Sequence, residues 1–358
     1  MSYKVLYLIS TLGGGGAESY LCSFSEELAL SHPEVSFTIC ALKKGGVFQK
    51  KLQDCNMKHM VIGGKGIIRH AVIVARLVRK ERIDIIHSHM LYADIVARLA
   101  KLMSKCYVVS THHGLGKWKK KLLIAIDRLT KGLVDHFIMV SDKSKEIRIK
   151  REKYSPDKIT VIYNGISQRF CENEGKTIGN KITIGTIARF TDNKQINLLI
   201  DVFYALRGIG NINLEIIGAG ENEIALKQQV KNLKIEEQVT FHGWLNDIKP
   251  VTKNWNIFVL CSINEDLPIS LIETMAQGIV PVASNVGGIP LLLKNGELGM
   301  LCDGKNKEVF IDGIRFLIDN PDVYQSMSTA AVKYIKDNFL IDMSVEKTLD
   351  IYNKLIKG

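Results

Sequence analysis

Residues 4–28 read KVLYLISTLGGGGAESYLCSFSEEL and combine three local signals. Residues 4–10 form a short apolar run that predicts a buried strand. Residues 13–16 are four glycines, and apolar side chains then recur at helical spacing over residues 17–28. The stretch therefore predicts a strand, a glycine loop and a helix, which is the first unit of an alternation that continues along the chain.

This alternation of strands and helices runs through two successive blocks. In the first block, further strands are predicted over residues 35–42, 83–87, 107–111 and 135–141, with helices over 67–80 and 93–103. The pattern restarts with strands over residues 181–188, 214–218, 239–243, 257–261 and 280–284, and helices over 196–206, 269–277, 309–320 and 324–357. Such alternation predicts two parallel, doubly wound α/β sheets.

The length of 358 residues fits two domains better than one. The stretch 172–180 (ENEGKTIGN) is polar and contains glycine, which is typical of a linker. We expect an N-terminal domain over residues 1–168, a C-terminal domain over 169–340, and a final helix, 341–358, that packs back toward the N-terminal domain. We also expect a cleft between the domains, because open α/β sheets bind ligands at the carboxyl ends of their strands.

Composition excludes several classes of protein. Hydrophobic residues make up 46% and charged residues 24%, as in globular proteins. No apolar run approaches the roughly 18 residues that span a membrane, and residues 5–9 are too short for a signal-peptide core, so we expect a cytosolic chain. The seven cysteines are scattered without a CxxC pair, which argues against a zinc or redox motif and against a disulfide framework.

Positive charge is concentrated in the first half of the chain. Residues 1–168 hold 28 Lys and Arg against 14 Asp and Glu, whereas residues 169–358 hold 20 against 23. This asymmetry predicts an anionic partner. The basic stretch Lys117, Trp118, Lys119, Lys120 and Lys121 precedes an apolar stripe, which favours an interfacial helix on a membrane. Nucleic acid is not expected as a partner, because no basic stripe with interleaved aromatic residues is present.

Four groups of residues that follow predicted strands could bind a ligand or take part in catalysis. The glycine loop 13–16 lets a backbone approach a ligand, although it is neither a Walker P-loop nor a good dinucleotide fingerprint. Arg189 and Lys194 suit a diphosphate. Glu265 and Glu273 could contact two ends of one ligand. His112 and His113 alternate in direction if their strand continues, so at most one of them would face a site.

The segment from Glu265 to Glu273 is followed by Met275-Ala276, Gly278, Pro281-Val282 and Gly287-Gly288-Ile289-Pro290. This combination resembles the retaining glycosyltransferases of family 4, which have the GT-B fold of two facing Rossmann-like domains. Shorter segments add to the resemblance over nearly the whole chain: Gly15-Gly16-Ala17-Glu18, residues 83–89, Thr111-His112-His113-Gly114, residues 161–166, residues 217–221 and residues 241–244.

The resemblance implies roles for individual residues. Catalytic roles would belong to Glu265, His113, Arg189 and Lys194. The donor would be bound by Glu273 at the ribose, by Arg189 and Lys194 at the diphosphate, and by Gly15, Gly16, Gly218, Leu267, Pro268 and Ile269. The acceptor side would include Gly14, Glu18 and His112. No metal and no other cofactor is expected, because the two cations would neutralise the leaving group.

The resemblance also implies an activity and a setting. The expected reaction moves a sugar, with retention, from a nucleoside diphosphate donor, expected to be UDP-linked, to a glycan acceptor. The acceptor is expected to be linked to polyprenyl diphosphate, in synthesis of a bacterial surface polysaccharide of the O-antigen or capsule type. The enzyme would be cytoplasmic and peripheral on the inner face of the plasma membrane, with its basic domain on anionic lipid.

Three positions depart from the pattern of the family. Asp266 stands where glycine usually follows the first glutamate, Gln195 replaces a glycine after Lys194, and Leu291 replaces an acidic residue. The extra charge of Asp266 leaves the donor sugar open between galactose, glucose and their N-acetylated amino forms. Two alternatives remain at this stage: a sugar-nucleotide epimerase of the same architecture, and a non-catalytic basic binding protein.

Overall fold

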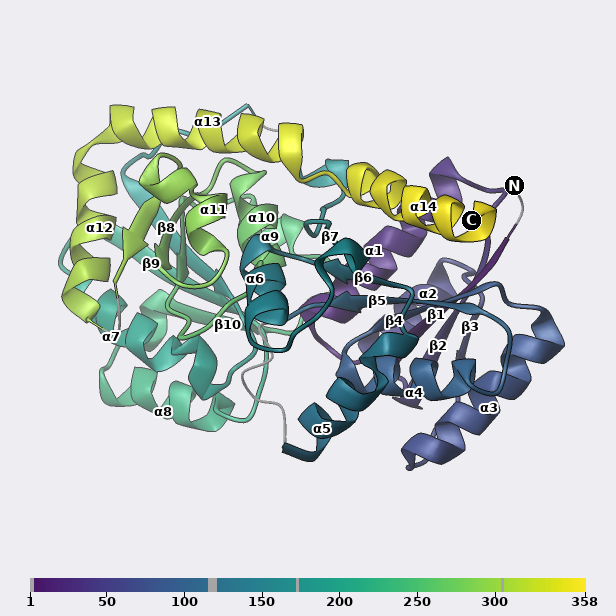
Figure 1. Ribbon diagram of the computed structural model, residues 1–358. Helices are drawn as coiled ribbons and strands as arrows, with labels where there is room; N and C mark the ends of the chain where they lie inside the picture. Colours follow the sequence, from purple (N-terminus) through teal and green to yellow (C-terminus); the bar gives the residue numbers. More distant parts are fainter. Residues whose placement is uncertain (1–2, 115–120, 172–173, 304–305) are drawn as a thin grey trace. The chain divides into compact units, whose positions relative to one another are not determined.

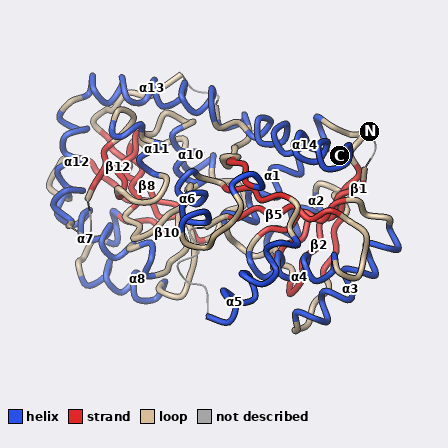
Figure 2. The backbone as a smooth tube through the Cα atoms, viewed as in Figure 1, coloured by secondary structure: helices blue, strands red, loops and turns tan. Residues whose placement is uncertain are grey.

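The computed structural model describes residues 3–114, 121–171, 174–303 and 306–358. The chain divides into two compact units, an N-terminal domain of residues 1–165 with 341–358, and a C-terminal domain of residues 166–340. Each domain contains one parallel sheet with helices on both of its faces (Figures 1 and 2). Both domains therefore have the doubly wound architecture that the sequence predicts.

The N-terminal sheet has seven strands in the described part of the chain, in the order β3-β2-β1-β4-β5-β6-β7. Its strands are β1 (Lys4–Thr11), β2 (Ser36–Lys44), β3 (His59–Val61), β4 (Ile85–His89), β5 (Tyr107–His112), β6 (His136–Met139) and β7 (Ile159–Val161). The order reverses between β1 and β4, so the loops that follow these two strands diverge at the point where such sheets bind ligands.

The helices of the N-terminal domain are α1 (Gly16–Ser31), α2 (Val47–Asp54), α3 (Ile67–Glu81), α4 (Leu91–Lys101), α5 (Lys121–Thr130), α6 (Asp142–Lys150) and α14 (Ile341–Lys357). Alternation along β1 decides which helices cover which face. Leu6 and Leu8 pack into the core shared with α3 and α4. Tyr7 points the other way, where its ring meets Phe24 of α1 and its hydroxyl meets Tyr352 of α14. Helix α14 consequently packs on α1 (Figure 1).

The C-terminal sheet has six strands in the described part, in the order β10-β9-β8-β11-β12-β13. They are β8 (Lys181–Ile187), β9 (Asn211–Ile217), β10 (Val239–Gly243), β11 (Ile257–Leu260), β12 (Val280–Ser284) and β13 (Met300–Cys302). The helices are α7 (Ile196–Leu206), α8 (Glu223–Asn232), α9 (Lys249–Thr252), α10 (Ile269–Met275), α11 (Ile289–Leu292), α12 (Lys307–Asp319) and α13 (Pro321–Asn338). Here the strand order reverses between β8 and β11.

The polar stretch expected to be a linker is packed onto the C-terminal domain where it is described. The Lys176 Nζ donates hydrogen bonds to the carbonyls of Lys253 and Trp255, each at 2.8 Å, and the Lys176 amide donates to Ser328 Oγ at 2.7 Å. Burial lowers the pKa of the Lys176 ammonium to about 8. The polar composition of this stretch predicted an exposed linker. Composition does not show that its polar groups form hydrogen bonds within the C-terminal domain.

Candidate functional site

The C-terminal domain brings residues together at the reversal point between β8 and β11. Lys194 lies in the loop after β8 and Glu265 in the loop after β11, 71 residues further along the chain. The Lys194 Nζ donates to Glu265 Oε1 in a short ion pair, and Ser262 Oγ donates to the same oxygen at 2.6 Å. The side chains of Lys194 and Glu265 are 22% and 10% exposed, so the pair is accessible but largely shielded. An ammonium and a carboxylate at one strand edge can together bind a phosphate and a sugar hydroxyl.

Backbone contacts fix these two loops to each other. The Ile263 amide donates to the Asn193 carbonyl at 2.8 Å, and the Asn193 side-chain amide donates to the Asn264 carbonyl at 3.0 Å. The positions of Lys194 and Glu265 are therefore set by main-chain geometry as well as by their own ion pair.

Glycine makes a third loop fit against Glu265. Gly287 has a φ of +61°, and a Cβ there would lie 1.8 Å from the Glu265 carbonyl oxygen. The next amide, that of Gly288, donates to the Asp266 carbonyl at 2.7 Å. Gly218 after β9 is similar, with a φ of +139° and a Cβ position 1.9 Å from the Ala188 carbonyl oxygen. These glycines are required by close backbone approach.

The remaining donor-side candidates lie on the same loops and on the helix that follows. Arg189 is exposed immediately after β8. Leu267 and Pro268 are buried, and Ile269 begins α10. Glu273 is half-buried on the same helix, one turn beyond its start. The structure thus places these candidates on the loops and the helix that follow β8 and β11, at the carboxyl edge of the sheet.

The N-terminal domain places its glycine loop at the start of α1, as the sequence predicts. Gly14 lies in the loop, Gly15 is the N-cap with extended backbone, and Gly16 begins the helix. Glu18, in the first turn, is 5% exposed and accepts a hydrogen bond from Thr11 Oγ1 at 3.0 Å. A buried carboxylate there already complements the positive end of the helix, which disfavours a second anion and favours a hydroxyl ligand.

His112 and His113 point to opposite faces of the N-terminal sheet. His113 Nε2 lies 2.9 Å from His89 Nδ1, and its ring lies 5.5 Å from that of Tyr20 on α1. His112 Nε2 lies 3.4 Å from Asp94 Oδ2 on α4. Alternation along β5 produces this separation. The turn after the two histidines is held by Arg148, which donates to the Gly114 carbonyl at 3.2 Å.

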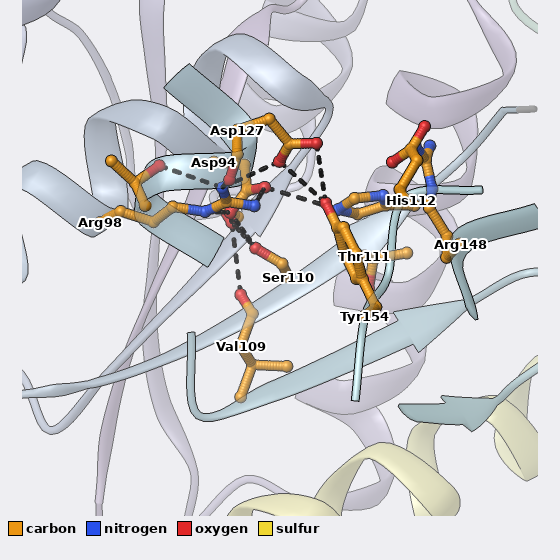
Figure 3. Close-up of polar contacts among 12 residues, drawn as sticks. Asp94, Arg98, Val109, Ser110, Thr111, His112, Asp127, Arg148 and Tyr154 are labelled. Atoms are coloured by element: carbon orange, nitrogen blue, oxygen red, sulfur yellow. Dashed lines mark hydrogen bonds and ion pairs between the residues drawn. The ribbon is translucent and has the colours of Figure 1, made fainter. Parts of the chain in front are cut away.

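A buried ionic network contacts His112 through Asp94 (Figure 3). Arg98 is 0% exposed and makes ion pairs with Asp94 and with Asp127, the latter at 2.9 Å. Tyr154 donates to Asp127 Oδ1 at 2.8 Å. Burial alone would raise the pKa of Asp94, but the Arg98 guanidinium and the hydrogen bonds from His112 and Ser110 hold it below its usual range. The network therefore places charged side chains on the face of the sheet where α4 packs against β5.

Comparison with protein families decides what these domains are. Residues 14–169 match the model "Glycosyltransferase Family 4", and residues 169–334 match the model "Glycosyl transferases group 1". The chain belongs to this glycosyltransferase family. It is accordingly an enzyme that uses a nucleotide sugar, so the epimerase and the binding-protein alternatives lose their support.

Individual relatives of this glycosyltransferase span most of the chain. UDP-Gal:alpha-D-GlcNAc-diphosphoundecaprenol alpha-1,3-galactosyltransferase of Escherichia coli is 27% identical over 311 residues, covering 81% of this chain and 80% of the relative. N-acetyl-alpha-D-glucosaminyl L-malate synthase of Bacillus anthracis is 24% identical over 298 residues, covering 79% and 78%. The crystal structure of Anabaena Alr3699/HepE with UDP and glucose matches with a TM-score of 0.85 at 18% identity, covering 98% of this chain and all of the other. The GT-B fold class expected from the sequence is confirmed.

Several residues beside the glycosyltransferase's candidate site were missed in the sequence. Ser262, Asp94, Arg98 and His89 all contact or support a predicted site residue. Asp94 and Arg98 are spaced as an ordinary surface i,i+4 ion pair, so their burial has no sequence signal. His89 could have been found, because it follows His87 by two residues and must share its face of the strand.

The structure describes only part of the predicted membrane segment of the glycosyltransferase. Lys117, Trp118, Lys119 and Lys120 lie outside the described residues, and Lys121 begins α5 without a described side chain. The basic helix α3 is described, and Arg76, Arg79 and Lys80 are exposed on it, as is Ile68 at its start, which is 75% exposed. None of the helices in the described ranges is long and apolar enough to cross a bilayer. Within the same ranges, no cluster of three or more His, Cys, Asp or Glu side chains could hold a metal ion.

Proposed function

We propose that this glycosyltransferase transfers a sugar, with retention of configuration, from a UDP-linked donor to a lipid-linked glycan acceptor. The observation that carries the proposal is the joined Lys194–Glu265 pair at the reversal point of the C-terminal sheet. Two findings on other proteins add support: the E. coli relative is named for a diphosphoundecaprenol-linked acceptor, and the Anabaena structure contains UDP and glucose. Synthesis of a bacterial surface polysaccharide, of the O-antigen or capsule type, is the proposed setting.

The C-terminal domain would hold the donor. Lys194 would leave its ion pair with Glu265 to neutralise the diphosphate, together with the exposed Arg189, and Glu265 would then accept hydrogen bonds from sugar hydroxyls. Glu273 on α10 would bind the ribose. Gly218 and the segment of Leu267, Pro268 and Ile269 would line the donor. The two cations would stabilise charge that develops on the leaving phosphate, and the proposed reaction needs neither a metal nor another cofactor.

The N-terminal domain would present the acceptor. Glu18 would orient an acceptor hydroxyl beside Gly14, while the amides of Gly15 and Gly16 and the side chain of His113 would contact the donor. His112, fixed by Asp94, would support the same turn. Retention would follow from attack on the face that the phosphate leaves, with the leaving phosphate accepting the acceptor proton. A double displacement is not proposed, because in the donor complex Ser262 Oγ and the sugar hydroxyls would occupy the Glu265 carboxylate.

Incubation of the purified enzyme with UDP-galactose, UDP-glucose, UDP-N-acetylglucosamine and UDP-N-acetylgalactosamine tests the proposal. We expect slow UDP release from one donor, accelerated by bacterial lipid extract, and an α-anomeric product by NMR. Absence of release from every donor, with no UDP binding by calorimetry, would contradict it.

The proposed position on the inner face of the plasma membrane has its own test. We expect the enzyme to float with vesicles that contain anionic phospholipid and to remain unbound with neutral vesicles. Reversal of the exposed charges of Arg76 and Arg79 to Glu should weaken flotation, whereas reversal of Lys227 on α8 should not. Equal binding to neutral vesicles would exclude docking by charge.

A further inference from the structure

Three imidazoles form a continuous stack at the carboxyl edge of the N-terminal sheet. His87 and His89 lie on β4 and share one face, and His113 follows β5. The ring centroids of His87 and His89 are 4.6 Å apart with an interplanar angle of 24°. Those of His89 and His113 are 5.2 Å apart with an angle of 22°. The stack therefore leads from the interior of the domain to the His113 side chain.

The inner end of the stack is anchored through both ring nitrogens of His87. Its Nδ1 makes a short hydrogen bond with the Tyr352 hydroxyl on α14, and its Nε2 lies 2.6 Å from Thr111 Oγ1. Tyr352 in turn donates to the Tyr7 hydroxyl at 3.4 Å. With both nitrogens engaged, His87 has one orientation, and its ring provides a fixed plane against which His89 stacks.

The outer end of the stack leaves two nitrogens without a partner among the described residues. His89 Nδ1 lies 2.9 Å from His113 Nε2, while His89 Nε2 and His113 Nδ1 are buried and unpaired there. Burial lowers the pKa of His113 to about 3, with a further contribution from the charge of His112, and burial likewise holds the pKa of His89 well below its usual value. Both rings are thus neutral near pH 7, and a single proton occupies the contact between them.

The position of that proton follows from the cost of burying an unpaired N–H. If His113 Nε2–H donated to His89, the proton of His89 would lie on Nε2, where the described residues offer no acceptor and the side chain is 1% exposed. Buried orphan N–H groups are rare, because each forfeits a hydrogen bond to water. If His89 Nδ1–H donates instead, the unpaired N–H is that of His113 Nδ1. This atom is buried as well, but its residue is partly exposed, so a ligand oxygen can reach it more readily than His89 Nε2.

We propose that His89 is a positioning residue that fixes the tautomer of His113, so that His113 presents a neutral Nδ1–H donor to a ligand oxygen. The acceptor would be a sugar hydroxyl or a phosphate oxygen of the substrate, and this identification rests on the function proposed above. In this state, Nδ1 of His113 donates a hydrogen bond and cannot accept a proton. His113 therefore orients the substrate and does not act as a general base.

Nitrogen-15 NMR of the full-length enzyme with labelled histidine reads the tautomer directly. The His113 signals are identified by their absence in His113→Gln. We expect a protonated Nδ1 and a bare Nε2 that do not titrate between pH 8 and 5. In His89→Phe, which keeps the stacked ring but removes the donor, we expect the His113 proton to move to Nε2. In His89→Asn, whose amide N–H reaches the place of Nδ1, the wild-type tautomer should persist. A proton on His113 Nε2 in the wild type, or no change in His89→Phe, overturns the proposal.

Kinetics supply the second measurement. We expect His89→Phe to lower kcat/KM about tenfold, as expected for one lost hydrogen bond, and His89→Asn to stay within about threefold. His136→Phe is the matched control, since His136 is another histidine of this sheet, bonded to Thr160 Oγ1 at 2.9 Å and outside the stack. Full activity of a folded His89→Phe would overturn the positioning role. The tautomer is measured without turnover, so failure of the proposed function leaves the NMR result to decide the proposal.

Discussion

The carboxyl edges of the two sheets carry different polar groups, although both sheets are parallel and doubly wound. The C-terminal edge holds an accessible Lys194–Glu265 pair on loops that pack through glycine. The N-terminal edge holds the buried carboxylate of Glu18 and neutral histidines. At the C-terminal edge, a bound diphosphate can replace Glu265 as the partner of Lys194. The neutral donors and the hydrogen-bonded carboxylate of the N-terminal edge suit hydroxyl groups instead.

The net charge of the domains does not predict this difference. Residues 1–168 have 14 more basic than acidic residues, yet the described N-terminal edge presents a carboxylate and uncharged imidazoles. Residues 169–358 have three more acidic than basic residues, yet their edge carries the cations Arg189 and Lys194 beside Glu265 and Glu273. The basic excess lies instead on surfaces such as the exposed side of α3. Domain charge therefore predicts what a surface attracts, and the strand-end loops predict what a site binds.

The largest expected effect concerns the buried network of the N-terminal domain. Asp94→Asn leaves Arg98 without one of its two buried carboxylates, and we expect the free energy of unfolding to fall by about 3–5 kcal/mol. Denaturant unfolding measures the change. Glu146→Gln is the control, since Glu146 pairs with Lys143 and Lys150 on the surface of α6 and should show no measurable loss. Equal losses in the two variants would mean that burial does not distinguish the pairs.

The second prediction uses the neutral histidines of the N-terminal domain. Burial lowers the pKa of His87 and His113 to about 3, and that of His89 well below 6.5. Because the unfolded chain then binds more protons between pH 6.5 and 3, the free energy of unfolding falls as pH falls through this window. We expect a loss of about 4 kcal/mol between pH 7 and 5.5 for the three groups together.

Denaturant unfolding at several pH values measures this slope, and His87→Phe should reduce it by about one third because one of the three groups is removed. A flat profile over the same range would show that these histidines are solvated or already charged.

The third prediction addresses the glycine packing of the C-terminal edge. Gly287→Ala adds a Cβ 1.8 Å from the Glu265 carbonyl oxygen, so the Glu265 loop must shift. Gly243→Ala is the matched control, because Gly243 has a similar φ of +67° and open space around its Cβ position. We expect Gly243→Ala to cost about 1 kcal/mol of stability and Gly287→Ala about 2 kcal/mol more, with weaker UDP binding. Similar stability and affinity in both variants would show that the close approach is unimportant.

The smallest effect concerns Gln195, one of the departures from the family pattern. It has left-handed backbone, with a φ of +46°, directly after Lys194 and before α7. Glycine relieves this strain, but it also loses more conformational entropy on folding. Gln195→Gly should therefore raise the free energy of unfolding by only about 0.5 kcal/mol. Gln195→Val, whose branched side chain fits this conformation poorly, should lower it by about 1 kcal/mol. Thermal unfolding distinguishes the two, and the reverse order would contradict the backbone assignment.

Much of the fold was predictable, and the exceptions have physical causes. β10 and β12 match the predicted residues 239–243 and 280–284, because apolar residues occupy alternate positions in both, at Val239 and Phe241 and at Val280 and Val282. The three-residue strands β3, β7 and β13 are too short to show alternation and were missed. The predicted helix 309–320 corresponds to α12, and Pro321 after it occupies the first turn of α13, where proline is tolerated. The predicted helix 324–357 divides into α13 and α14, and α14 begins at Ile341, where the expected final helix 341–358 begins.

The candidate site was predictable to a similar degree. Residues that follow strands, such as Lys194 and Glu265, could be selected from the sequence, since the ends of parallel strands gather at one edge. Their direct contact could not, because it depends on the strand order that sets β8 beside β11. The support of His112 by Asp94 depends in the same way on α4 packing beneath β5.

UDP release by Lys194→Ala, measured beside the wild type, tests the central claim that the C-terminal edge holds the diphosphate. Lys227→Ala is the control, since Lys227 forms an exposed i,i+4 ion pair with Glu223 in the same domain. We expect Lys194→Ala to remain folded and to lose about 100-fold or more in kcat/KM, while Lys227→Ala is unchanged. A folded Lys194→Ala that releases UDP within about threefold of the wild-type rate would contradict the assignment of the donor site.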